Sequence, residues 1–548
     1  MRALPFALAA ALAACASAPA PQDEPAAQAT QPVQATLVHA IDVPAIRRPT
    51  GESAAWWYRA GAARAAANGA MQGRARNVIV FLGDGMNLPT VAAARVLAGQ
   101  RAGQPGEETQ LSFETFPNTA LSRTYNTDFQ TPDSAGTMTA IATGAKTRMG
   151  VIGIGQGTPR GDCASVADNM LLSFIELAES AGLGTGIVTT TRLTHATPAS
   201  VYAHGPERNW EDDSYLPAEK AKAGCRDLAA QWLAFDFGDG VDIALAGGRA
   251  KFTPKSLGGM RKDGRNLVAE WQAKYGDARY VTTAAELAQA NDATRVIGLF
   301  APQHLPYVAD RKADATEPTL AEMTQAAIAH LQRNDRGFVL LVEGGNIDRA
   351  HHAGNARRAL EETIAFSDAV RAADEATRDD DTLILVTADH AHTMFFAGYP
   401  ERGNPILDKV RGISGEDPTD SEFAGDKHGL PYTTLGYANG PGFVPPQPGK
   451  ARPDLSKVDT QAVDYLQEAL VPLGGETHGG DDVGVWAKGN GADAVRGSIE
   501  QNVLYHFLVQ ATPVLRERLC AAGTCNEDGV PVELPKPADF KSTSDAKH

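Results

Sequence analysis

Short apolar runs separated by longer amphipathic stretches recur along the chain and predict its secondary structure. Runs of strand length that end in small or acidic residues occupy 77–82, 184–191, 241–246, 338–342 and 382–387. Between them, apolar residues recur at helical spacing over 167–180, 320–332 and 357–376. Such alternation favours an α/β fold with a large, mostly parallel central sheet and helices on both faces. In folds of this class, ligands bind beyond the carboxyl ends of the strands.

Two regions interrupt this rhythm. Residues 396–475 are richer in Gly, Pro and polar residues, and we interpret them as an insertion or cap over the site. Residues 513–548 form a Pro- and Lys-containing tail, which we expect to be peripheral. The main domain is therefore expected over 51–512.

The N-terminus has the composition of an export signal. Residues 1–14 combine one basic residue with an apolar stretch, as in a secretory signal peptide. The Leu-Ala-Ala-Cys segment that ends at Cys15 resembles a bacterial lipobox, in which cleavage precedes the cysteine and acyl chains anchor it to a membrane. A plain signal peptide with an incidental cysteine is the alternative. Residues 15–50 would form a flexible tether, and we expect a periplasmic or cell-surface protein anchored to the outer membrane.

Four cysteines remain after Cys15, and an even number in an exported chain favours disulfide bonds. Cys520 and Cys525 close a short loop and are the simplest pair to propose, which leaves Cys163 to pair with Cys225. A zinc site of cysteines and histidines is the competing interpretation, but the chain has no CxxC motif.

Acidic residues outnumber basic ones by 66 to 50, which gives a net charge of −16. A chain with this charge lacks the large basic patch through which proteins release counterions from nucleic acid, so we expect no nucleic-acid partner. An anionic substrate would need positive charge supplied locally, for example by metal ions.

The segment that follows 338–342 holds the most informative group of polar residues. Glu343 ends the apolar run, and Asp348 and His352 follow at a spacing that places both side chains on one face of a helical turn. Carboxylate and imidazole ligands suit zinc and similar divalent cations. Taken alone, the segment is equally compatible with a solvated charged loop.

Similar residues recur elsewhere. Asp84 lies on a tight Gly-Asp-Gly turn after a strand, and Asp389 and His390 are adjacent at another strand end. His478 stands in a Gly-rich segment where a backbone can approach a ligand closely. So many converging carboxylates would repel one another without cations, so metal ions are the natural resolution.

Ser134 is the candidate nucleophile. Pro132 and Asp133 lead into an apolar pattern with small residues, which places Ser134 near a helix N-terminus, where it could serve as an N-cap. Free amides and the helix dipole at that position also attract phosphate. The chain has no G-x-S-x-G elbow, and metal coordination could activate the hydroxyl without a histidine base. Arg208 could clamp phosphate oxygens, although a surface arginine is the simpler interpretation.

Together these residues resemble the alkaline phosphatase family, from about Trp56 to beyond Ala487. The RNW segment at 208–210 and the THGGDDV segment at 477–483 are more similar to the animal-type branch than to the best-known bacterial type. The resemblance implies the family's fold, with 396–475 as a crown-like insertion that contains the YTTLGYANGPG segment.

The resemblance also implies a role for each candidate residue. Ser134 of the Asp133-Ser134 pair would be the nucleophile, and Arg208 would clamp the phosphate. The ligand groups would be Asp348, His352 and His478 for one Zn²⁺, Asp84, Asp389 and His390 for a second Zn²⁺, and Asp84, Thr197 and Glu343 for one Mg²⁺.

Some positions depart from the family's pattern. His195 lies beside the third metal site, where the best-studied bacterial form has Asp. Arg349 stands where Lys or His is common. Ala301 replaces the acidic residue of an additional calcium site, so that site is not expected here. In contrast, the two cysteine pairings proposed above agree with the animal-type branch of the family, which also has them.

The implied activity is hydrolysis of phosphate monoesters through a phosphoseryl intermediate. The segment 54–67, AAWWYRAGAARAAA, resembles the family's interface helix, so we expect a homodimer. The nearest alternative is a phosphodiesterase or sulfatase of the same superfamily, but Arg208 favours monoesters because a diester lacks the extra charged oxygen. A non-catalytic lipoprotein that binds phosphate and metal is the alternative from another class.

Overall fold

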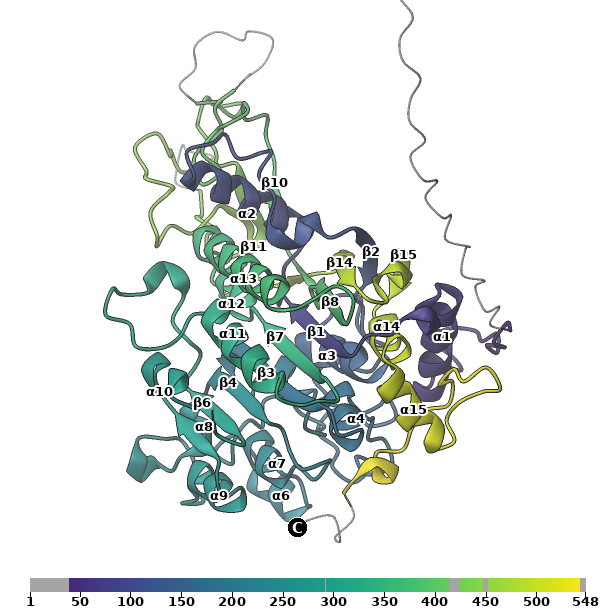
Figure 1. Ribbon diagram of the computed structural model, residues 1–548. Coiled ribbons are helices and arrows are strands. Elements are labelled where there is room, and N and C mark those ends of the chain that lie inside the picture. The colour runs from purple at the N-terminus through teal and green to yellow at the C-terminus, as the bar shows by residue number, and fades with distance from the viewer. Residues whose placement is uncertain (1–38, 291, 413–422, 447–451, 543–548) are drawn as a thin grey trace, which may run out of the picture. The chain divides into compact units, whose positions relative to one another are not determined.

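A ten-stranded sheet forms the centre of the computed structural model, which describes residues 39–290, 292–412, 423–446 and 452–542 (Figure 1). In order across the sheet, the strands are β15 (Gly497–Glu500), β2 (Asn118–Arg123), β14 (Val483–Gly489), β8 (Thr382–Thr387), β1 (Asn77–Leu82), β7 (Phe338–Glu343), β3 (Gly184–Arg192), β4 (Ile243–Gly247), β6 (Val296–Leu299) and β5 (Arg279–Val281). All neighbours from β8 to β5 pair in parallel, whereas β14 is antiparallel to β2 and β8. The predicted, mostly parallel α/β sheet is confirmed.

The central strands are apolar because both faces of the sheet are covered. In β1, Val78, Val80 and Leu82 pack into one hydrophobic core, and Ile79 and Phe81 pack into the core on the opposite face. Successive side chains of a strand point to opposite faces, so a doubly covered strand is a continuous apolar run.

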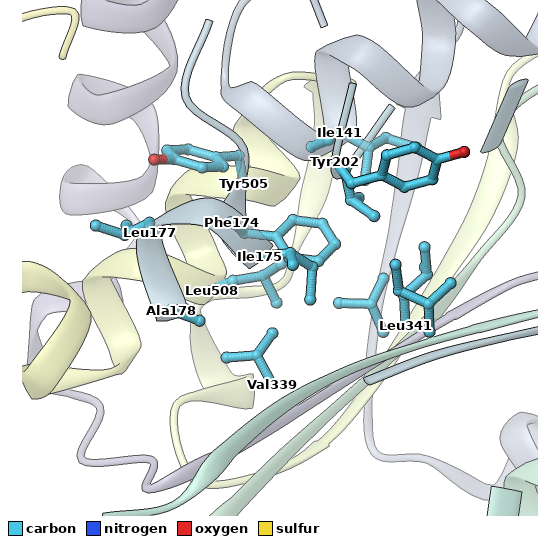
Figure 2. Close-up of a cluster of buried hydrophobic side chains, with 14 of the residues drawn as sticks. Ile141, Phe174, Ile175, Leu177, Ala178, Tyr202, Val339, Leu341, Tyr505 and Leu508 are labelled. Atoms are coloured by element: carbon cyan, nitrogen blue, oxygen red, sulfur yellow. The ribbon is translucent and has the colours of Figure 1, made fainter. Parts of the chain in front are cut away.

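Two helical layers cover these faces (Figure 1). One contains α2 (Leu88–Arg101), α11 (Leu320–Leu331) and α13 (Ala356–Ala376), and the other contains α3 (Ser134–Thr143), α4 (Phe174–Ser180), α14 (Val503–Ala511) and α15 (Pro513–Ala521). Figure 2 shows part of the core beneath this second layer, where Phe174 of α4 and Leu508 of α14 face the side of β7 that carries Val339 and Leu341.

The predicted strands all occur, with ends that differ by at most two residues. The helix predicted over 167–180 was wrong at its start, because α4 begins only at Phe174. There the Ser173 hydroxyl accepts a hydrogen bond from the Glu176 N–H, and the Glu176 carboxylate accepts one from the Ser173 N–H. This capping box fixes the start of the helix. Just before it, the Leu171 N–H donates to a distant backbone carbonyl instead of a helical one.

Most of a small second sheet lies within the region predicted as an insertion, and its first strand begins two residues before that region. Its strands are β10 (Met394–Phe396), β11 (Leu435–Gly440) and β12 (Ala469–Pro472), with β11 in the middle. That this region is the family's crown stays a prediction.

The C-terminal segment packs more closely than its composition suggests. Helix α15 buries Leu515 and Leu519, and Phe540 further along is also buried. A disulfide joins Cys520 to Cys525, and a second disulfide joins Cys163 to Cys225. Both predicted cysteine pairings are therefore present.

The predicted signal peptide 1–14 and the lipidated Cys15 lie outside the described residues, as does most of the tether 15–50. Within the described part of the chain, no helix combines the length and the apolar character that a membrane crossing requires. The segment 54–67 forms helix α1 (Ala54–Ala67), which packs against α14 of the same chain.

Candidate metal centre

Three acidic residues meet at the carboxyl edge of the sheet. Asp84 follows β1, Glu343 ends β7, and Asp389 follows β8. Strand β1 lies between β7 and β8 in parallel register, so the ends of all three strands are adjacent. The three carboxylates are fully buried. Their position at the carboxyl ends of parallel strands is where ligands bind in folds of this class.

A first group of ligands forms around Asp348. Asp348 and His352 lie on α12 (Asn346–His352), one helical turn apart as predicted. Strand β13 (His478–Gly479) pairs with β9 (Ala391–His392) and brings His478 to the same place. Asp348 Oδ1 lies 3.3 Å from Nε2 of His352 and 3.3 Å from Nε2 of His478, and these two nitrogens are 3.0 Å apart.

The hydrogen bonds of these imidazoles show which nitrogens are available to a metal. His352 Nδ1 lies 2.6 Å from the carbonyl oxygen of Glu476, and His478 Nδ1 lies 2.7 Å from that of Pro132. A carbonyl oxygen only accepts, so each Nδ1 donates its proton, and in the neutral form of each ring the lone pair lies on Nε2. Two such lone pairs facing each other and a carboxylate fit a cation between them. Two imidazoles and one carboxylate are a common zinc ligand set.

A second group surrounds the candidate nucleophile. Ser134 is the first residue of α3, and Asp133 is its N-cap. Ser134 Oγ lies 3.1 Å from His390 Nε2 and 3.5 Å from Asp84 Oδ1. His390 Nε2 in turn lies 3.3 Å from Asp84 Oδ1 and 3.5 Å from Asp389 Oδ2. The serine hydroxyl is thus next to the three ligands predicted for the second cation.

Unpaired buried atoms indicate a third cation position. Asp84 Oδ2, Glu343 Oε1, Thr197 Oγ1 and His195 Nδ1 are all buried without a hydrogen-bond partner. Ligand atoms of Asp84, His195 and Glu343 lie within 4.8 Å of one another. Thr197 lies on α5 (Ala196–Ala199), which His195 precedes as the N-cap. Buried polar atoms without partners are costly, and a bound cation would satisfy them.

Two carboxylates of this centre, those of Asp84 and Glu343, are not balanced by the protein's own charges. Burial, together with the carboxylates of Asp389, Asp348 and Glu343, raises the pKa of Asp84 well above its usual range. Burial also raises the pKa of Glu343 to about 7. For Asp348, burial has the same direction, but His352 and other imidazoles outweigh it and hold its pKa well below the usual range. Divalent cations would favour the ionised form of all these groups.

Arg208 is held beside the N-terminus of α3. Its Nη1 donates to Asp133 Oδ2 at 3.0 Å, and the same carboxylate accepts from the N–H groups of Gly136 and Gly150. Burial opposes ionisation of Asp133, but Arg208 and these amides outweigh it and lower its pKa. A guanidinium has five N–H donors, so Arg208 keeps donors for an anion at the helix terminus.

Sequence reasoning missed two residues of this centre, His392 and Glu476. His392 Nε2 lies 2.8 Å from Asp348 Oδ1, and its Nδ1 lies 2.5 Å from Glu476 Oε2. Burial lowers the pKa of His392, but the two carboxylates outweigh it and raise this pKa to about 10. A signal was present, since His392 stands two residues after His390 and Glu476 two residues before His478, the spacing that returns to the same side of an extended chain.

Comparisons with known proteins agree on one family. The alkaline phosphatase family model matches residues 75–514. An alkaline phosphatase of Gadus morhua is 42% identical over 461 residues, which are 81% of this chain and 93% of that protein. The human tissue-nonspecific alkaline phosphatase is 40% identical over 453 residues, 80% of this chain and 83% of the relative.

A solved structure leads to the same family. The alkaline phosphatase of Thermus thermophilus has a TM-score of 0.58 and 26% identity, and covers 82% of this chain and 96% of its own. The two sequence relatives come from animals, in agreement with the branch that the RNW and THGGDDV segments resemble.

Proposed function

This chain belongs to the alkaline phosphatase family, and we propose that it hydrolyses phosphate monoesters to inorganic phosphate and an alcohol. The observation that carries this proposal is the position of Ser134. Its Oγ lies at the N-terminus of α3, 3.1 Å from His390 Nε2, while Arg208 is held beside it by Asp133. A nucleophile, an anion-binding helix end and a group of metal ligands thus meet at one point.

The ligand atoms fit two Zn²⁺ and one Mg²⁺. We assign Asp348, His352 and His478 to one zinc, Asp84, Asp389 and His390 to the other, and Asp84, Thr197 and Glu343 to magnesium, with His195 as a neighbour of that third site. When bound, these ions supply positive charge and lower the pKa of oxygen atoms that they contact. The facing Nε2 atoms and the unpaired carboxylate oxygens support this assignment.

Within this site, Ser134 acts as the nucleophile. Its Oγ loses its proton and attacks phosphorus, the bond from phosphorus to the alcohol oxygen breaks, and the alcohol oxygen takes up one proton and leaves. Arg208 and the Ser134 N–H hold the non-bridging oxygens, and the dipole of α3 favours their negative charge. Water then attacks the phosphoserine, phosphate leaves, and Ser134 regains its proton. Two displacements in succession give overall retention of configuration at phosphorus.

The substrate class is tested by comparing an aryl phosphate, the corresponding aryl diester and the aryl sulfate on the zinc- and magnesium-loaded protein. The monoester should be turned over fastest, because only its terminal phosphoryl group offers Arg208 an additional charged oxygen. Faster turnover of the diester or the sulfate would instead indicate a phosphodiesterase or a sulfatase.

We further propose an exported, lipid-anchored homodimer. The two disulfides support export, since such bonds persist in oxidising compartments. Helix α1 already packs against its own chain, so a dimer interface there would use its remaining surface, including the half-buried Trp56. Sedimentation analysis of the purified protein tests the dimer, and mass spectrometry of the mature N-terminus tests the lipid on Cys15.

A further inference from the structure

Glu476 contacts the metal centre through both its side chain and its backbone. Its Oε2 lies 2.5 Å from His392 Nδ1, and its Oε1 accepts from the N–H and the hydroxyl of Thr393 at 2.6 and 2.5 Å. Its carbonyl oxygen lies 2.6 Å from Nδ1 of His352. The residue is only 2% exposed, so its carboxylate and the contact with His392 are shielded from water.

Through these contacts Glu476 reaches two of the three ligands assigned to the first zinc. It holds the His352 ring directly, with Nε2 directed to the ligand group. It holds Asp348 through His392, whose Nε2 lies 2.8 Å from Asp348 Oδ1. The His392 ring has little room to turn, because His351 stacks on it at 4.8 Å and a Cβ at Gly85 would collide with it.

The third ligand is fixed by the same short loop. His478 follows Glu476 by two residues and donates through Nδ1 to the carbonyl of Pro132. Between them, the Thr477 N–H donates to Asn439 Oδ1 at 2.9 Å, and Asn439 Nδ2 donates back to the Thr477 hydroxyl at 2.9 Å. Because Asn439 belongs to β11, the loop also connects the small second sheet to the ligand group.

We propose that Glu476 is a positioning residue for the zinc site formed by Asp348, His352 and His478. Its two carboxylate oxygens are taken up by His392 and Thr393, so it orients the ligands and does not itself bind the metal. Partners of this kind fix the ring orientation of a metal-binding histidine, and their loss typically lowers metal affinity about 10–100-fold. The inference rests on the proposed function, because it takes this group as a zinc site.

The chain contains a matched pair that serves as a control. Glu176 is fully buried and its Oε1 lies 2.8 Å from Nε2 of His204, outside the ligand groups. Glu176→Gln removes a buried glutamate–histidine contact of similar geometry without touching a ligand. It should lower the stability of the fold and leave zinc affinity unchanged.

The test is a zinc titration of the metal-free protein in competition with a chromophoric chelator. For Glu476→Gln we expect one zinc-binding step to weaken about 10–100-fold, while the other steps stay as in the wild type. Turnover of an aryl phosphate should recover as zinc is raised, since Glu476 does not touch the substrate. Thr393→Val removes one donor to Glu476 and should weaken the same step to a smaller extent, which provides the measurement if Glu476→Gln does not fold.

Two outcomes would overturn the inference. One is wild-type zinc affinity in both Glu476→Gln and Thr393→Val. The other is an equal loss of affinity in the Glu176→Gln control, which would indicate a general effect on folding. Failure of the proposed function would look different, because the zinc- and magnesium-loaded wild-type protein would then not turn over the aryl phosphate.

Discussion

The metal centre and the ion-pair network around Arg261 both bury charged side chains, but they balance the charge differently. In the network, Arg261 donates to both oxygens of Asp227 at 2.9 and 3.2 Å and to Asp263 Oδ2 at 2.5 Å. Nearby, Lys251 Nζ lies 2.9 Å from Asp212 Oδ2. Each buried charge of the network therefore has an opposite charge of the same chain in contact with it.

The metal centre lacks such partners. Among the residues that the structure describes, no lysine or arginine forms an ion pair with Asp84, Glu343 or Asp389. Burial removes these carboxylates from water, and the nearby imidazoles do not replace a lysine or arginine. The comparison teaches that buried acidic residues have two roles in this protein. In the Arg261 network their charge is balanced by basic side chains of the same chain, whereas in the metal centre the balance depends on added cations.

Removal of the cations should separate the two regions most strongly. Treatment with a chelator should reduce turnover of an aryl phosphate by roughly 10³-fold or more, because metal ions contribute several kcal/mol to such transition states. Far-UV circular dichroism should remain that of a folded protein, and Zn²⁺ with Mg²⁺ should restore activity. Full activity in protein shown by metal analysis to be free of metal would contradict this account.

Arg261→Met should destabilise the fold with little effect on catalysis. The change leaves Asp227 buried without its partner, and breaking a buried pair in this way costs about 3–5 kcal/mol. Urea unfolding measures this loss, and kcat/KM of the folded variant should stay close to the wild-type value. Arg265→Met is the control, since the pair of Arg265 with Glu270 is exposed and should contribute about 1 kcal/mol or less.

Asp84→Asn should have the opposite effect on the metal-free protein. At alkaline pH, folding must move the ionised carboxyl of the unfolded chain into an environment that raises its pKa. Asparagine avoids this cost, so the free energy of unfolding of the metal-free protein should rise. Phosphatase activity should be lost. A less stable metal-free variant would show that this charge is already balanced.

The free energy of unfolding of the metal-free protein should also depend on pH through the buried carboxyl of Glu343, with a smaller effect than that of Asp84→Asn. Burial raises the pKa of Glu343 from 4.5 to about 7, so the folded protein binds more protons than the unfolded chain between these values. The protonated Glu343 side chain makes its full contribution to stability below the pKa that it has in the unfolded chain. This contribution is lost as pH rises to about 7. Chemical unfolding across this interval measures the slope, which Glu343→Gln should reduce. An unchanged slope in that variant would exclude Glu343 as its source.

Much of this architecture could be predicted from local patterns. Continuous apolar runs gave the central strands, and the position of Asp84 at a strand end, or of Asp348 and His352 on one helical turn, gave candidate ligands. The spacing of two residues from His390 and His478 could have marked His392 and Glu476 as candidates. It does not encode their contact with each other, which joins residues 84 positions apart. The late start of α4 depended on a capping box rather than on apolar periodicity.

The most direct test of the central claim is to trap the phosphorylated enzyme. The metal-loaded protein is quenched with acid during turnover of an aryl phosphate, digested and analysed by mass spectrometry. The account predicts one phosphate on the peptide that contains Ser134, and neither this phosphate nor appreciable turnover in Ser134→Ala. Sustained turnover with Ser134 unmodified, or a Ser134→Ala variant that retains wild-type turnover, would contradict it.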